Sequence, residues 1–183
     1  MRNSLLIIVI AIISSCKSEY KSPYPADQDL FLNEVRSYAN QYTGNENGAF
    51  RTKLRMKRAT WIKTQAQLKK GVTGWVGEVK DVSTSSVDNA ISLSLNFSGY
   101  PIEIKTWSNF LSDNLSGEKT MIELNSALGQ KIVSLRIGQK VKFSGKFLTD
   151  NGENGIEEMS ITESGSMTEP EFTFIFSDIA PIN

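Results

Sequence analysis

Strict alternation of apolar and polar residues is the feature of this sequence that most restricts its fold. From 91 to 97 every odd position is a large apolar residue and every even one is Ser or Asn, and similar alternation returns at 102–104, 141–147 and 172–176. A period of two places successive side chains on opposite faces of an extended chain, so these segments predict half-buried strands. Gly74 and Gly77 interrupt another apolar run at 72–82, which predicts a long strand with a bulge or bend.

Two helices are expected before these strands. The first begins at Asp27 or Asp29, whose carboxylates suit the positive end of the helix dipole. Its apolar stripe recurs at helical spacing and predicts a docking face. The stripe consists of Phe31, Val35, Tyr38 and Tyr42. The second helix covers 50–62, after the Gly- and Asn-rich break at 44–48.

The order of elements after residue 71 is three strands, a short helix at 126–135, and two further strands followed by a terminal one. The fifth strand is expected at 158–163, with Met159 and Ile161 buried. A long bent first strand, a hairpin and a helix between strands 3 and 4 resemble the OB-fold over 72–179, by topology alone. The predicted fold class is therefore mainly β: a five- to six-stranded OB-like Greek-key barrel in a domain at 71–183, preceded by a helical arm at 27–70.

The N-terminus reads as an export signal. Arg2 precedes an apolar run at 5–13, which is shorter than the roughly 20 residues of a membrane-spanning helix. Ile13-Ser14-Ser15-Cys16 resembles the lipobox of bacterial lipoproteins. That resemblance implies a lipid thioether on Cys16, with residues 1–15 as signal peptide and 16–26 as a lipidated tether. A plain signal peptide or a buried free cysteine are the alternatives.

Missing residue types exclude several classes of enzyme. The chain has no histidine, and Cys16 is its only cysteine. Ser-His-Asp and Cys-His nucleophilic sites and zinc sites rich in His and Cys are therefore impossible. The loop at 150–155 departs from an EF-hand, because Gly152 occupies its third position and Ile161 its twelfth. We expect a non-catalytic protein without cofactor or metal.

A basic segment at 51–70 contains eight Lys and Arg residues and no acidic residue. On a helix Arg51, Arg55 and Arg58 share one side. Three interpretations compete: a solvated face, contact with anionic lipid head groups near the anchor, and contact with acidic residues of a partner or of the C-terminal third.

A ligand face is expected on the outer side of strands 2 and 3, as in OB-folds. Here it would include Ser94, Lys105 and Trp107. Nucleic acid is not expected as a partner, because only Trp107 fits a base-stacking role and the chain is predicted to be exported. The candidate site residues of a ligand or partner face are thus Trp107, Lys105, Ser94, Arg51, Arg55 and Arg58.

Two segments, 138–145 and 164–172, are similar to segments of small bacterial envelope lipoproteins, a resemblance that implies no activity. We expect a lipid-anchored binding or assembly module for another envelope protein. The alternatives are an immunity or inhibitor lipoprotein against a toxin or hydrolase, and a small-ligand binder that uses the barrel mouth. Lys17 after Cys16 implies the outer membrane, facing the periplasm, in a bacterium with two membranes; with a single membrane, its outer surface is expected.

Overall fold

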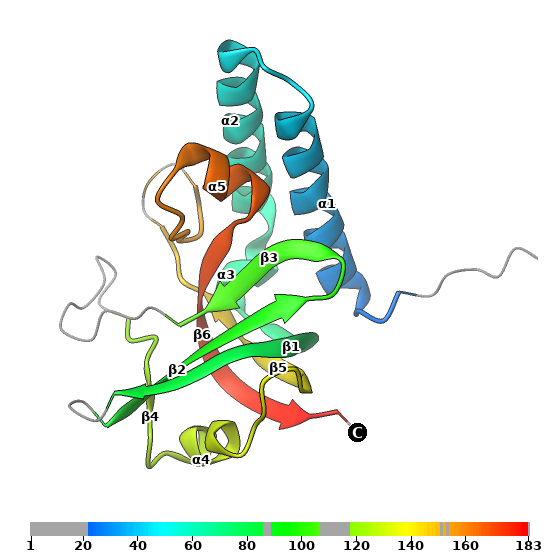
Figure 1. Ribbon diagram of the computed structural model, residues 1–183. Helices are drawn as coiled ribbons and strands as arrows, with labels where there is room; N and C mark the ends of the chain where they lie inside the picture. Colours follow the sequence, from blue (N-terminus) through cyan, green and yellow to red (C-terminus); the bar gives the residue numbers. More distant parts are fainter. Residues whose placement is uncertain (1–21, 86–88, 107–117, 151, 153, 183) are drawn as a thin grey trace, which may run out of the picture.

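A computed structural model describes residues 22–85, 89–106, 118–150, 152 and 154–182 (Figure 1). A helical hairpin stands on a strongly curved sheet, and three shorter helices accompany them. The helices are α1 (Ala26–Thr43), α2 (Gly48–Thr64), α3 (Ala66–Lys70), α4 (Ala127–Val133) and α5 (Glu163–Thr168). The strands are β1 (Val72–Ser85), β2 (Ala90–Phe97), β3 (Tyr100–Lys105), β4 (Ile122–Glu123), β5 (Lys140–Phe147) and β6 (Glu171–Pro181).

Five of the described strands close into a ring. The sheet order is β1-β5-β6-β3-β2-β4, and β1 also pairs with β2, which joins the two ends and leaves β4 outside the ring. The β3–β6 pair is parallel and the others are antiparallel. Strand β1 can reach both neighbours because it bends: its register shifts between Val72 and Trp75 and again between Val79 and Asp81. The predicted interruption of this strand is confirmed.

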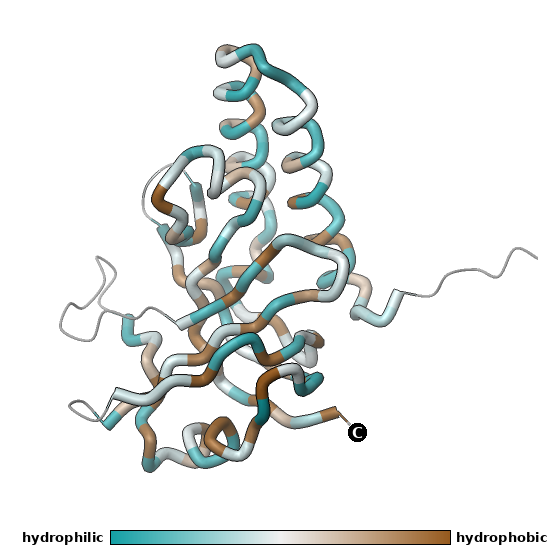
Figure 2. The backbone as a smooth tube through the Cα atoms, in the orientation of Figure 1, coloured by the Kyte–Doolittle hydropathy of each residue, from teal (hydrophilic) through white to brown (hydrophobic). Residues whose placement is uncertain are grey.

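Aromatic side chains fill the ring. Phe147 contacts Trp75, Phe172 and Phe174, and all four are fully buried. Phe31 of α1 packs on Trp75, Phe147 and Phe172, so the first helix closes one end of the same core (Figure 2). The predicted apolar stripe of α1 is confirmed, because Phe31, Val35 and Tyr42 are buried and Tyr38 is half-buried. The helical segment and the sheet therefore share one apolar cluster.

The prediction of a mainly β chain is correct only in part, because the described residues form a mixed α/β structure with five helices and a six-stranded sheet. The predicted short helix before the fourth long strand is confirmed as α4, with Ile132 buried. The strand predicted at 158–163 is wrong. Only a single bridge joins Glu158 to Phe172, and Ile161 is fully exposed.

The carboxylate of Glu158 accounts for this difference. It accepts hydrogen bonds from the backbone N–H and the hydroxyl of Ser160 and from the N–H of Glu171. These bonds turn the chain away from the sheet, as local side-chain acceptors commonly do. Thr162 then caps α5 by accepting from Gly165 N at 3.0 Å, so a short helix begins at Glu163, where the predicted strand would have ended.

Candidate functional site

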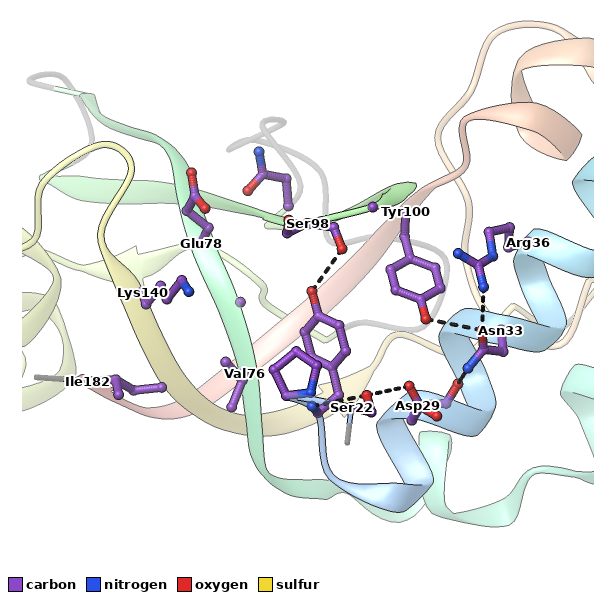
Figure 3. Close-up of a pocket in the computed structure, with 15 residues that line it drawn as sticks. Ser22, Asp29, Asn33, Arg36, Val76, Glu78, Ser98, Tyr100, Lys140 and Ile182 are labelled. Atoms are coloured by element: carbon purple, nitrogen blue, oxygen red, sulfur yellow. Dashed lines mark hydrogen bonds between the residues drawn. The ribbon is translucent and has the colours of Figure 1, made fainter. Parts of the chain in front are cut away.

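A pocket of about 630 Å³ lies between the first half of α1 and the edge of the ring (Figure 3). One wall comes from α1 and the segment before it, the other from β1, the β2–β3 turn and the start of β5. The turn consists of Ser98 and Gly99, while Tyr100 and Pro101 already belong to β3. The pocket therefore sits where β1 diverges from β2, at one end of the ring.

Two contacts fix α1 against β1 and so set the width of the pocket. Gln28, fully buried, donates from Nε2 to Val76 O at 2.6 Å and accepts from Val76 N at 2.7 Å. Trp75 Nε1 donates to Asp27 Oδ2 at 2.8 Å. Because both partners on α1 lie in its first turn, the helix start is held on the strand by directed bonds as well as by packing.

The helical wall is a chain of hydrogen bonds around Asn33. Its Oδ1 accepts from Arg36 at 2.7 Å and from the Tyr100 hydroxyl at 3.1 Å. The Arg36 guanidinium also lies 4.4 Å from the centre of the Tyr100 ring, a cation–π distance. Tyr24 stands edge-on to Tyr100 and donates to Ser98 O at 3.2 Å. Two aromatic rings are thus held rigidly beside the opening.

The opposite wall carries polar groups that the fold leaves unused. Glu78 and Lys140 are directly opposed on β1 and β5, and among the described residues neither side chain forms a hydrogen bond or an ion pair. Asn96 Oδ1, in register with Glu78 on β2, is buried and has no hydrogen-bond partner among those residues. Buried acceptors are nearly always satisfied, so an orphan at a pocket wall marks a place for a ligand group or water.

The predicted face on strands 2 and 3 is occupied by ion pairs. Lys105 Nζ lies 2.5 Å from Glu171 Oε2 and 4.0 Å from Glu103 Oε1. Lys80 of β1 bonds the same Glu103, and this hydrogen bond raises the pKa of the Lys80 ammonium above its usual value. Ser94 is 8% exposed on β2. Lys105 and Ser94 are brought together across β2 and β3, within a surface whose charges already have partners.

The three predicted arginines face the body of the protein. Arg58 is 3% exposed and donates to Ser166 O at 2.5 Å. Burial lowers its pKa, while nearby Glu158 opposes that shift. Arg55 Nε lies 3.9 Å from Glu163 Oε2. Arg51 donates to the carbonyls of Tyr42 and Asn45 and lies over the Tyr42 ring. Only Arg55 lies within ion-pair distance of an acid of the C-terminal third, so the third interpretation of the basic segment fits Arg55, whereas Arg58 and Arg51 bond to backbone carbonyls.

Cys16 and Trp107 lie outside the described residues, as do the predicted signal peptide and most of the tether. Within the described ranges, no helix is long and apolar enough to cross a membrane. The same residues contain no cluster of three or more His, Cys, Asp or Glu side chains placed to hold a metal ion.

Sequence reasoning missed the pocket. Its walls combine residues from the tether, α1, β1, β2, β3 and β5, which no linear motif connects. The available signal was weak, because Glu78 and Lys140 stand among other charged residues of their strands, such as Lys80 and Lys142. Asn96 gave no stronger signal, because it stands at one of the even, polar positions of the alternating strand at 91–97.

Comparison with known proteins adds no assignment. No protein-family model matches the chain, and no curated protein shows significant similarity to it.

Proposed function

We propose that this chain is a lipid-anchored, non-catalytic binding module of the bacterial envelope, and that the pocket at the foot of α1 is its recognition site. The observation that carries the proposal is the set of polar groups that the fold builds into the pocket wall and leaves without partners: Glu78, Lys140 and the Oδ1 of Asn96. An unpaired buried acceptor such as Asn96 Oδ1 lowers stability, and a ligand that donates to it would recover that loss, while Glu78 and Lys140 are accessible for ion pairs with the ligand.

The ring of strands supports an OB-type barrel as the framework. Its circular order, β1-β2-β3-β6-β5, includes the parallel β3–β6 pair, and α4 precedes β5. In OB-folds the strand 2–3 face and neighbouring loops bind ligands. The pocket lies beside the β2–β3 turn, at the opposite end of β2 from the β1–β2 loop, so it differs from the site that OB-folds commonly use.

A segment of another envelope protein fits the pocket chemistry best. The lining pairs two acids, Asp29 and Glu78, with two bases, Arg36 and Lys140, so it offers donors and acceptors without a net charge. A peptide segment presents the same mixture. Ser98 and Gly99 at the pocket rim are exposed, which leaves room for the bound segment to continue past the pocket.

A small polar ligand is the second candidate. The volume of about 630 Å³ falls within the range of roughly 300–1,000 Å³ that small-molecule sites occupy. The rigid Tyr24–Tyr100 pair would supply its apolar contact surface.

In-cell photo-crosslinking separates these candidates. A photoreactive residue replaces Ser98, which is exposed at the pocket rim, and in the control strain replaces Thr52, which is exposed on α2. We expect one dominant protein adduct, identified by mass spectrometry, from position 98 and not from position 52. Equal adducts from both positions would contradict a pocket-specific partner. Absence of protein adducts, with a ligand from envelope extracts raising the melting temperature, would favour the small ligand.

The anchor is tested separately with Cys16→Ser. We expect this variant to lose lipid labelling and to leave the membrane fraction, as an outer-membrane or outer-surface lipoprotein should. Retention in the membrane after a high-salt wash, without a lipid label, would overturn the anchor, and it would leave the pocket untouched.

A further inference from the structure

The basic residues of α2 divide by type. Its three arginines bond to the body of the protein, whereas Lys53, Lys57 and Lys63 are exposed. Among the described residues, no acidic side chain lies within ion-pair distance of these lysines. The arginines therefore stabilise the fold, and the lysines remain available to contact another molecule.

Apolar side chains accompany these lysines on the outer surface of the helix. Phe50 is 40% exposed and Met56 is 60% exposed. At 3.6 residues per turn, positions 53, 56, 57, 60, 63 and 64 follow one another along one side of a helix. We define the lysine face as the exposed residues Phe50, Lys53, Met56, Lys57, Thr60 and Lys63.

We infer that the lysine face rests on an anionic lipid surface. Lysine stems can lie along the interface with their ammonium groups at the phosphates, while Phe50 and Met56 enter the head-group layer. No acidic residue occurs between 51 and 70 in the sequence, and in the part of the chain that the structure describes the nearest acidic segment, 150–158, approaches the face only at Lys63, beside Gly155. Because the whole chain has a formal net charge of zero, attraction to such a surface must come from a local patch of this kind.

The proposed lipid anchor would keep this face near its target. Cys16 precedes the start of α1 by ten residues, a reach of at most about 35 Å for an extended chain. Helix α2 is itself about 25 Å long. The attraction between the lysine face and lipid does not depend on the anchor or on the pocket, so each is tested by its own variant.

The test uses the unlipidated chain from Lys17 onward, which keeps every described residue of the apolar core. Binding is measured by co-sedimentation with vesicles that mix phosphatidylglycerol with phosphatidylcholine, and with vesicles of phosphatidylcholine alone. We expect binding to the anionic vesicles at low salt and little binding to the neutral ones. Replacing Lys53, Lys57 and Lys63 by Gln should weaken the partition coefficient by about 100-fold, at roughly fivefold per cation.

A matched control replaces three exposed lysines away from the helical hairpin, Lys119, Lys131 and Lys142. This variant has the same net charge as the triple variant of the lysine face, and we expect it to bind like the wild type. A second variant, Phe50→Ser with Met56→Gln, keeps every charge and should weaken binding several-fold. Equal losses in the two lysine variants, or no binding to anionic vesicles by the wild type, would overturn the inference.

Discussion

The side chain of Gln28 takes the place of a neighbouring strand for Val76. Its amide donates to Val76 O at 2.6 Å and accepts from Val76 N at 2.7 Å, the pattern of a paired β-residue. Strand β1 pairs with β2 only from Glu78 onward, so the peptide groups of Val76 would otherwise lack partners on that side. A fully buried glutamine thus joins the first turn of α1 to the ring beside the pocket.

We expect Gln28→Ala to lower the free energy of unfolding by about 2–4 kcal/mol, because the packing of a fully buried side chain is lost and both backbone groups of half-buried Val76 lose their partners. Urea unfolding followed by tryptophan fluorescence measures this loss. Gln41→Ala is the control, since Gln41 is exposed on the same helix and bonds only to Ser37, one turn earlier. A loss for Gln28→Ala no larger than that for Gln41→Ala would show that the strand-like contact contributes little.

Arg58→Met should detach α5 before it unfolds the protein. The buried guanidinium donates to Ser166 O in α5, and the apolar stem of methionine keeps most of the packing but removes this bond. We expect faster amide exchange in Glu163–Thr168 and a stability loss of about 1–3 kcal/mol. The exposed neighbour Lys57→Met serves as control. Unchanged exchange in α5 would mean that the buried Met167 and the contacts of Glu163 with Tyr42 and Arg55 hold it without this bond.

The fold was largely predictable where packing enforces a period. Alternation located β2, β5 and β6, and the helical spacing of Phe31, Val35 and Tyr42 located the buried side of α1. It failed at Ile161, where alternation continued but the carboxylate of Glu158 turned the chain. Local hydrogen bonds of this kind leave no periodic signal in a sequence.

The candidate site was less predictable than the fold. The arginines of α2 could be assigned to one side, but the acids that meet them, such as Glu163, lie over a hundred residues away in the chain. The pairing of β1 with β2, which closes the ring and forms the pocket beside Asn96, likewise depends on tertiary structure. It could not be predicted from local sequence patterns. Burial of Arg58 could not be read from its charge, because arginine is mostly exposed unless paired.

The contribution of Glu157 to the stability of the folded protein should fall as pH rises. Burial, together with nearby Asp150, raises the pKa of the Glu157 carboxyl above its ordinary value of 4.5, so the folded state favours the protonated form. When a group has a higher pKa in the folded state than in the unfolded state, its protonation stabilises the folded protein. This contribution is complete below the pKa of the unfolded state, and it is lost as pH rises through the pKa of the folded state. Glu157→Gln, which mimics the protonated form, should therefore gain stability over the wild type between acidic and neutral pH.

This prediction is measured by urea unfolding of both proteins across that pH range. Glu46→Gln is the control, because Glu46 is exposed near the α1–α2 turn and should leave the pH dependence unchanged. A stability difference between Glu157→Gln and wild type that stays constant with pH would rule out the raised carboxyl as its source.

Gly145 is a position in the ring where the packing leaves no room for a side chain. The register between β5 and β6 shifts between Ser144 and Gly145, and the glycine has φ +156°. A Cβ there would lie 2.1 Å from Ile175 O and 2.5 Å from the Phe174 ring, both held by the packed core. Gly145→Ala must therefore move β6 or break the bulge, and we expect a loss of about 3 kcal/mol in urea unfolding. Gly48→Ala, where a Cβ meets nothing within 4 Å, should leave stability unchanged or slightly raised, and equal effects of the two substitutions would contradict this account of the bulge.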